Sequence, residues 1–359
     1  MLLACSAGGK PDASAPVAGS EAAPLVESYA PAHSATASGT SSAPPERGPS
    51  AAVDANRPAA RVPAVTPDSA PGPAPAESPF PPKNVAPPSA RSAEAGDGVW
   101  TPFSDARTSA GAPFFYTTKL HPHPTSRFVT LTLVAIDLGA VRLGFMPGVE
   151  DVGKQAVPFE PGLVPSAERE RTLAAFNGGF MPRHGRWGMQ LGATTIVPPR
   201  EPGCTLALFD DGVRLRSWSV LAADAARPLA LRQTPPCLLE QGAVHPLLMK
   251  GLDKAWAGHT PGVVTRRRSA IGLNRAANVL FYAVGVEAPA RLLAEGLLAA
   301  GAHDAAELDI NWNWTRFLTF AKNEDGALRV AQSLVDVQYS NRAYVERASE
   351  RDFFYLVRR

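Results

Sequence analysis

The prolines of this chain are concentrated toward its N-terminal end. Half of the 36 prolines precede Val99, in a stretch whose only aromatic residues are Tyr29 and Phe80. Such a segment cannot bury enough apolar surface to offset the entropy of ordering it. We therefore predict a disordered Pro/Ala/Ser-rich tail over residues 1–98. Residues 99–359 hold all six tryptophans and are predicted to form one folded domain with a large core.

The first five residues, MLLAC, are similar to the end of a bacterial lipoprotein signal, in which an apolar run stops at a cysteine that receives lipid. A complete signal has an apolar run of about 7 to 15 residues. The run before Cys5 is shorter, so a cysteine without a role is the alternative. We favour the lipoprotein, because a long spacer suits a domain held away from a membrane anchor. The expectation is an exported protein of the bacterial outer membrane or periplasm.

Two further cysteines, Cys204 and Cys237, lie within the folded domain. In an exported protein they form a disulfide or remain two separate buried thiols, and the sequence favours neither.

Charge and hydropathy exclude two classes of partner. The formal net charge of +2, from 35 basic and 33 acidic residues, gives no electrostatic case for nucleic acid. No unbroken apolar run of about 18 residues occurs, so no membrane-spanning helix is expected. The only membrane contact we expect is a lipid on Cys5.

Apolar and β-branched runs predict a domain made mostly of strands. Residues 128–138 and 141–147 are predicted to form a first hairpin. Residues 204–218 are predicted to form a second hairpin, because Asp211 and Gly212 are the residue types that a primed turn prefers. Residues 269–286 are predicted to form a third.

One segment has helical spacing. Leucines recur every three or four positions in residues 289–302, a proline stands at the entry, and Gly301 can end the helix. Strands are predicted to follow at residues 307–314 and 352–359. No repeat of 20 to 50 residues occurs. The fold class is therefore α+β, a single strand-dominated domain with hairpins and a few helices.

Three segments carry residues suited to chemistry, and the first is AFNGGF. Paired glycines after Asn177 let successive backbone N–H groups face one point, which suits a phosphate. The alternative is a hairpin turn with Asn177 and Gly178 at its corner, which is the commoner use of this pair.

The second segment has three consecutive arginines at the start of a predicted strand. Alternation along a strand places Arg266 and Arg268 on one face and Arg267 on the other, so at least one guanidinium can face a site. A guanidinium matches phosphate geometry well. The alternative is a solvated basic edge.

The third segment, residues 307–314, alternates strictly between polar and apolar residues. Glu307, Asp309, Asn311 and Asn313 are predicted on one face, and Leu308, Ile310, Trp312 and Trp314 on the other. Same-face carboxylates about 7 Å apart along a strand can serve one substrate or bind a hard cation. A strand with one wet face is the alternative without function.

In this order, the three segments resemble the phosphodiester glycosidase family, to which the animal "uncovering" enzyme belongs. The resemblance rests on AFNGGF, on RSAIG at residues 268–272, and on the helix and strand of LLAAGAHDAAELD at residues 297–309. It spans roughly residues 128–320.

The resemblance implies hydrolysis of a sugar linked through its anomeric carbon to a phosphodiester, by an enzyme of the glycoside hydrolase class. Stabilising the charge of the leaving phosphate then matters more than protonating it, which suits Arg268 and the glycine turn. Asp309 is the first candidate to activate water or attack the sugar, and Glu307 the second. His184 and His303 are candidate proton carriers. The expected substrate-binding residues are Asn177, Gly178, Gly179, Arg266, Asn311 and Trp312.

The sequence departs from the family after Asp309. Bulky residues follow it, from Ile310 to Trp314, where the family has a glycine-rich loop. Either Trp312 or Trp314 stacks on a different sugar, or the domain binds glycan or phosphate without catalysis and Trp312 fills the space between Asn177 and Arg268.

A metal-dependent phosphodiesterase is a third possibility. The seven histidines are scattered and form no HxH or HExxH set, so we expect no cofactor and no metal site; a divalent cation requirement stays open.

Overall fold

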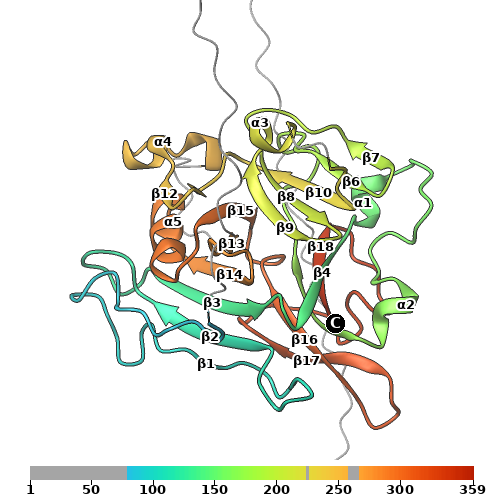
Figure 1. The fold of residues 1–359 in the computed structure, drawn as a ribbon, viewed down its shortest axis with the longest axis horizontal. Coiled ribbons are helices and arrows are strands. Elements are labelled where there is room, and N and C mark those ends of the chain that lie inside the picture. The colour runs from blue at the N-terminus through green and yellow to red at the C-terminus, as the bar shows by residue number, and fades with distance from the viewer. Residues whose placement is uncertain (1–78, 224–225, 258–266) are drawn as a thin grey trace, which may run out of the picture. The chain divides into compact units, whose positions relative to one another are not determined.

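The computed structural model describes residues 79–223, 226–257 and 267–359. Antiparallel strand pairs dominate this part of the chain and form three sheets (Figure 1). The strand-dominated α+β prediction is confirmed for the described residues. Residues 1–78, which include Cys5 and most of the predicted tail, lie outside them.

The large sheet has eight strands in the order β1-β2-β3-β14-β13-β15-β11-β12. Its strands are β1 (Thr101–Pro102), β2 (Phe115–Leu120), β3 (Thr130–Asp137), β11 (Leu239–Glu240), β12 (Ala243–Val244), β13 (Arg267–Leu273), β14 (Val279–Val286) and β15 (Asp304–Ile310). The central strands are buried on both faces: Leu131 and Phe281 pack with helix α5 (Ala290–Ala299), and Ile271 and Tyr282 pack on the opposite side. Burial on both faces explains why these strands are continuous apolar runs.

Two five-stranded sheets complete the domain. The β10 sheet has the order β7-β6-β10-β8-β9, and the β18 sheet has the order β17-β16-β5-β18-β4. The strands of the first are β6 (Met189–Leu191), β7 (Thr194–Val197), β8 (Cys204–Phe209), β9 (Gly212–Ser217) and β10 (Ala230–Thr234). Those of the second are β4 (Val141–Met146), β5 (Thr172–Asn177), β16 (Phe317–Lys322), β17 (Leu328–Ser333) and β18 (Phe353–Arg358).

An aromatic cluster joins the large sheet to the β18 sheet. The ring of Phe176 on β5 stacks on Phe317 at 5.8 Å and on Phe354 at 5.4 Å between centroids. Tyr282 on β14 reaches the same ring at 5.0 Å. Aromatic contacts of this kind add about 0.5 to 1.5 kcal/mol each to the free energy gained by burial. The end of β5, where the Asn-Gly-Gly segment begins, is therefore firmly placed.

The helices are short except for α5. They are α1 (Val149–Val152), α2 (Ser166–Arg169), α3 (Trp218–Leu221), α4 (Pro246–Met249) and the 3₁₀ turn η1 (Lys254–Trp256). Helix α5 confirms the predicted helix, with Pro289 as its N-cap and Gly301 just beyond its end at φ +103°. At 10 residues α5 is the longest helix described, and none of the described helices has the length and apolar character of a membrane span.

Two of the three predicted hairpins are confirmed. Strands β8 and β9 pair, and β13 pairs with β14. The turn between β8 and β9 lies at Asp210 and Asp211, whereas the predicted Asp211 and Gly212 are wrong as its corner, because Gly212 already pairs with Phe209 as the first residue of β9. The first predicted hairpin is wrong, because β3 pairs with β2 and β14 whereas β4 pairs with β18. The connection from Leu138 to Ala140 crosses from one sheet to another, so that each strand buries its apolar side in the shared core.

Residues 79–98, which the sequence assigns to the tail, pack on the domain. Phe80 contacts Tyr116 edge to face at 5.5 Å. The buried Ser92 hydroxyl donates to the carbonyl of His121 at 2.9 Å, and the Asp97 carboxylate bonds the ring of His121 at 2.9 Å. Only Phe80 and Val85 pack on the core, and polar bonds hold the rest of the segment, so its low apolar content did not predict its packing. These residues belong with the folded part of the chain.

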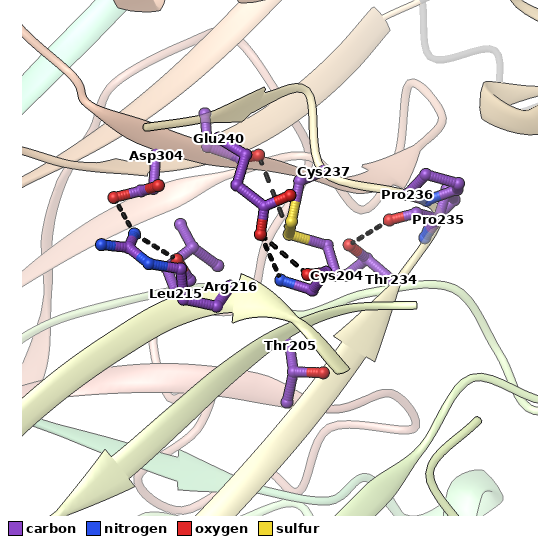
Figure 2. Close-up of a disulfide and its surroundings, with 12 residues drawn as sticks. Cys204, Thr205, Leu215, Arg216, Thr234, Pro235, Pro236, Cys237, Glu240 and Asp304 are labelled. Atoms are coloured by element: carbon purple, nitrogen blue, oxygen red, sulfur yellow. Dashed lines mark hydrogen bonds and ion pairs between the residues drawn. A yellow bond between two sulfur atoms is a disulfide. The ribbon is translucent and has the colours of Figure 1, made fainter. Parts of the chain in front are cut away.

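A disulfide joins Cys204 at the start of β8 to Cys237, just before β11 (Figure 2). The two cysteines are buried and 33 residues apart in sequence. The bridge fastens the β10 sheet to the large sheet, and it decides the alternative that the sequence left open. Disulfides persist in oxidising compartments, so the bond is consistent with export.

Candidate functional site

Asn177, at the end of β5, joins two sheets by its side chain. Its Oδ1 accepts from the Tyr282 hydroxyl at 2.7 Å and from the Arg316 backbone N–H at 3.1 Å. Its Nδ2 donates to Ser269 Oγ at 2.8 Å and to the Gly178 carbonyl at 2.9 Å. Asn177 is buried, and these four bonds use its hydrogen-bonding capacity. Asn177 connects the strands around the site, and it is not among the residues that line the cavity beside Asp309.

The two glycines that follow are bound to Asp352. The Gly178 N–H donates to the Asp352 carbonyl at 2.9 Å, and the Gly179 N–H donates to the Asp352 carboxylate at 3.0 Å. Buried Arg232 on β10 pairs with the same carboxylate at 2.7 Å and also donates to the Phe180 carbonyl. Both glycine N–H groups are thus already used, and they do not form a free nest for a phosphate.

The glycines are required by close approach rather than by a turn. A Cβ on Gly178 would lie 1.9 Å from Asp352 Oδ2, and one on Gly179 would lie 3.1 Å from the guanidinium carbon of Arg232. Neither glycine has the positive φ of a primed turn, and β5 pairs with β16 and β18 rather than with a strand that follows it. The hairpin-corner alternative is therefore wrong.

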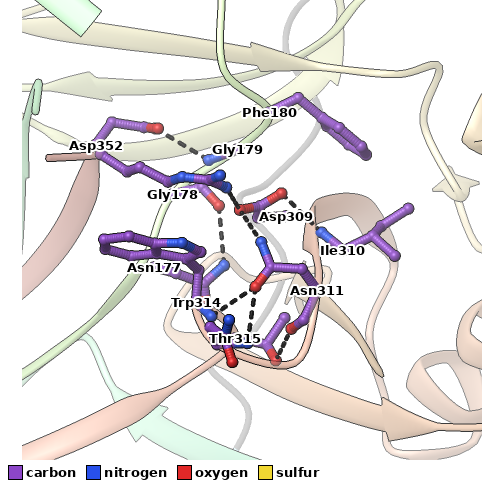
Figure 3. A network of polar contacts seen from close by, with 12 residues as sticks. Asn177, Gly178, Gly179, Phe180, Asp309, Ile310, Asn311, Trp314, Thr315 and Asp352 are labelled. Carbon is purple, nitrogen blue, oxygen red and sulfur yellow. Dashed lines mark hydrogen bonds and ion pairs between the residues drawn. The ribbon is translucent and has the colours of Figure 1, made fainter. Parts of the chain in front are cut away.

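Asp309, near the end of β15, is anchored on this glycine segment. Its backbone N–H donates to the Gly178 carbonyl at 3.1 Å. Its carboxylate accepts from the Ile310 N–H at 2.9 Å and from Asn311 Nδ2 at 3.1 Å (Figure 3). It also forms an ion pair with Arg351. Asp309 is only 4% exposed.

Two opposing effects act on the Asp309 carboxyl. Burial raises its pKa, and the Arg351 guanidinium and the Ile310 N–H lower it; the balance is a raised pKa. A carboxyl with a perturbed pKa beside a guanidinium in a cleft is a candidate functional group.

A cavity of about 730 Å³ opens beside Asp309 and Arg351. Its lining combines aromatic rings, cationic groups and a single carboxylate. The residues of its wall are Phe180, His184, Gly185, Trp187, Pro235, Lys254, Ala255, Ala257, Arg267, Asp309, Ile310, Asn311, Trp312 and Arg351. Among the described residues of that wall, Asp309 is the one carboxylate.

Glu307 and Arg268 form a buried pair away from this cavity. Arg268 Nη1 donates to Glu307 Oε1 at 2.6 Å and to the Trp256 carbonyl at 2.7 Å, and Glu307 has no exposed surface. Arg268 on β13 pairs with Ile310 on β15, and Ala270 pairs with Glu307. Between these pairs, one residue of β13 therefore lies opposite two residues of β15. That β-bulge breaks the strict alternation, which is why Glu307 and Asp309 do not share one site.

Arg267, rather than Arg268, lines the cavity. Its guanidinium lies over the Trp312 ring at 4.5 Å and donates to the carbonyls of Trp312 at 3.3 Å and Asp336 at 2.8 Å. Arg266, predicted to bind substrate, lies outside the described residues. Trp312 is 41% exposed and therefore does not fill the space between the Asn177 and Arg268 side chains, as the binding-only alternative required.

The predicted strand stops at Ile310, because Asn311 turns the chain. Asn311 Oδ1 accepts the N–H groups of Asn313 at 2.8 Å and Trp314 at 2.7 Å, an Asx turn that replaces the strand ladder. The Arg351 guanidinium lies 4.9 Å from the Trp314 ring centre. Trp314 thus supports Arg351 and does not line the cavity, whereas Asn311 and Trp312 do.

The two histidine candidates are separated. His184 lines the cavity, and burial, together with Arg183 and Arg351, lowers its pKa, which favours the neutral imidazole. His303 does not line the cavity, and its Nδ1 bonds Asp304 at 3.0 Å. Asp304 lies in the surroundings of the disulfide (Figure 2).

Sequence reasoning missed Arg351, Asp352 and Arg232. The first two are adjacent and precede β18, whose Phe353 pairs with Asn177. The only sequence signal for Arg351 and Asp352 is that they stand directly before an apolar strand at the end of the chain, and such a pair has no distinctive spacing. The antiparallel pairing of β18 with β5 brings Arg351 and Asp352 to the site, and no sequence motif predicts this pairing. Among the described residues, no group of three or more His, Cys, Asp or Glu side chains is placed to hold a metal ion.

Comparisons with known proteins find weak similarity to solved structures. No protein-family model matches the chain, and no curated protein matches it. The catalytic domain of zebrafish N-acetylglucosamine-1-phosphodiester α-N-acetylglucosaminidase is similar with a TM-score of 0.44 and 14% identity, over 71% of this chain and 87% of that one. A hypothetical protein from Synechocystis is similar with a TM-score of 0.35 and 11% identity, over 68% and 64%. Likeness at this level carries no argument about the site, which has to stand on its own geometry.

Proposed function

We propose that the cavity beside Asp309 binds a sugar joined through its anomeric carbon to a phosphodiester, and hydrolyses that bond. The observation that carries the proposal is the Asp309–Arg351 pair at the wall of an aromatic, cationic cavity. Arg351 offers a fork of donors for a phosphate, and Asp309 lies beside it.

The single carboxylate favours this substrate over an ordinary glycoside. Glycosidases that expel an alcohol use two carboxyl groups, one of which protonates the leaving oxygen. Among the described residues, Asp309 is the one carboxylate of the cavity wall. A phosphate is a far better leaving group than an alcohol, so its charge needs stabilisation rather than a strong acid, and Arg351 supplies it.

In the proposed reaction the bond between the anomeric carbon and the phosphate oxygen breaks. The phosphomonoester leaves with the electron pair, a water oxygen bonds to the carbon, and the water proton passes to Asp309 acting as base. If Asp309 attacks the carbon first, water releases the sugar in a second step. In this two-step route Asp309 is bound to the sugar, and the neutral imidazole of His184 on the same wall takes the proton of the water that releases the sugar.

Export and anchoring belong to the same proposal. The buried Cys204–Cys237 bond favours an oxidising compartment. We propose an exported envelope protein, tethered through Cys5 and the residues before the domain. Mass spectrometry of the membrane fraction would find a lipid on Cys5; an unmodified Cys5 in that fraction would remove the anchor.

A second candidate is a binding domain for envelope glycan or phosphate without catalysis. The specific observation in its favour is that both Asp309 oxygens already have partners and that the residue is 4% exposed. Exposed Trp312 and the open cavity suit either function.

Turnover in ¹⁸O-labelled water separates these functions. The protein is incubated with a sugar 1-phosphodiester such as methyl N-acetylglucosamine 1-phosphate, and the products are weighed by mass spectrometry. Free sugar together with unlabelled methyl phosphate supports the proposal, because a free sugar also exchanges its anomeric oxygen with water and its own label is therefore not decisive. Label in the phosphate means a phosphodiesterase, and binding without product means the binding domain. Addition of a chelator tests whether turnover depends on a divalent cation.

A further inference from the structure

Two tryptophans from separate parts of the chain line the cavity beside Asp309. Trp187 lies in the connection between β5 and β6, and Trp312 follows β15. Each has an arginine over its ring: the guanidinium carbon of Arg200 is 5.0 Å from the Trp187 centroid, and that of Arg267 is 4.5 Å from the Trp312 centroid. Of the six tryptophans in the sequence, these are the two on the cavity wall.

Both arginines are themselves held by backbone carbonyls. Arg267 donates to the carbonyl of Trp312 and, at 2.8 Å, to that of Asp336. Arg200 donates to the carbonyls of Gly185 at 3.0 Å and Glu201 at 3.2 Å. Because the guanidinium groups are fixed, they restrain the rings that they cover.

Gly185 adds a second restraint on Trp187. It has φ +109°, and a Cβ placed on it would lie 2.6 Å from Trp187 Nε1. The indole therefore packs against the glycine backbone, and no larger residue fits there. These contacts restrain both rings before any ligand arrives, which reduces the entropy lost on binding.

A guanidinium over one face of an indole does not occupy the opposite face, and both tryptophans line the cavity, with Trp312 41% exposed. Indole faces carry negative charge and attract weakly positive C–H groups, which the apolar face of a pyranose ring presents in a row. A flat or cyclic ligand gains from two such walls, whereas a flexible acyclic one does not.

We propose that Trp187 and Trp312 form a two-walled aromatic subsite that takes the pyranose ring of a sugar 1-phosphate group, while Arg351 takes the phosphate. This rests on the proposed function in that it assigns the two halves of the same substrate. It adds that the site selects cyclic sugar phosphates over acyclic phosphates of equal charge.

The experiment compares the affinities of two probes with the same anionic group. Calorimetric titration measures the dissociation constants of glucose 1-phosphate and of glycerol 1-phosphate, which has no ring. We expect glucose 1-phosphate to bind at least about tenfold more tightly, a difference of about 1.4 kcal/mol. Trp187→Ala and Trp312→Ala should each reduce that ratio to about two or less, while glycerol 1-phosphate affinity stays the same.

Two further variants keep the result interpretable. Trp312→Phe retains a ring and should preserve part of the ratio even where Trp312→Ala folds poorly. Trp218→Ala, on α3 and not on the cavity wall, should leave the ratio unchanged. A ratio near one in the wild type, or an unchanged ratio in both alanine variants, overturns the subsite. Binding is measured separately from turnover, so the two proposals can fail separately. If the alanine variants lose the affinity ratio but the wild type hydrolyses no substrate, only the proposed reaction is refuted. If the wild type hydrolyses the substrate but the alanine variants keep the ratio, only the subsite is refuted.

Discussion

A buried carboxyl next to the site makes the stability of the domain depend on pH in a specific direction. Asp151 on α1 is buried, and its carboxylate accepts the Gly148 N–H at 2.9 Å. Burial and the neighbouring Asp352 carboxylate raise the pKa of Asp151 from its ordinary 3.8 to about 7, despite the opposing charge of Arg232.

The direction of the effect follows from proton binding. Between pH 3.8 and about 7 the folded protein keeps a proton on Asp151 that the unfolded chain has lost. The free energy of unfolding therefore falls as pH rises through this range. A shift of about 3 units corresponds to on the order of 4 kcal/mol at pH 8. Asp151→Asn still accepts from Gly148 and cannot ionise, so it should match the wild type at pH 3.5 and exceed it in stability at pH 8.

Urea unfolding of both proteins at pH 3.5, 5, 6.5 and 8 measures the difference directly. The difference in the free energy of unfolding between Asp151→Asn and the wild type should grow from about zero at pH 3.5 toward about 4 kcal/mol at pH 8. Glu150→Gln, on the same helix but exposed, is the matched control and should show no such growth. A difference that is constant across pH would falsify the assignment of a protonated Asp151 in the folded state.

Three further predictions concern the glycine segment, the disulfide and the arginine of the cavity. Gly178→Ala should destabilise the domain by more than about 3 kcal/mol, since its Cβ would lie 1.9 Å from a carboxylate oxygen. Gly179→Ala should cost about 1 to 2 kcal/mol, because its nearest contact is at 3.1 Å. Equal losses of the free energy of unfolding in urea would refute this difference. Replacing Cys204 and Cys237 together by serine opens a loop closed across 33 residues and should lower the free energy of unfolding by about 4 kcal/mol, and a change below about 1 kcal/mol would contradict it. Arg351→Gln should raise KM for a sugar phosphodiester about tenfold or more. It should also move the acidic limb of the pH–rate profile to higher pH, because Asp309 loses the cation that lowers its pKa. An acidic limb at the same pH would count against the Asp309–Arg351 pair.

Much of the fold could be predicted because local patterns agree with the packing. Residues 204–218 and 269–286 form the expected hairpins, and the helix of residues 289–302 lies where its spacing placed it. The pairing of β3 and β4 could not be predicted, since a short connection does not show whether two strands share one sheet or pass between two.

The site was less predictable because its geometry depends on irregular backbone. A bulge on β15 separates Glu307 from Asp309, and the Asx turn at Asn311 ends the strand. One residue more or less in a strand moves side chains to the opposite face, and no periodicity reports it. Arg351 and Asp352 reach the site from the far end of the chain through strand pairing, which a motif confined to residues 128–320 cannot contain.

The central claim is that Asp309 acts on a sugar phosphodiester, and the rate of free-sugar release from methyl N-acetylglucosamine 1-phosphate by wild type, Asp309→Asn and Asn313→Ala tests it most directly. Asn313 lies on the same loop and is exposed, so it is the control for local disturbance. We predict a loss of at least about 100-fold in kcat for Asp309→Asn with an unchanged thermal unfolding midpoint, and full activity for Asn313→Ala. Wild-type release that persists in a folded Asp309→Asn protein would contradict the account.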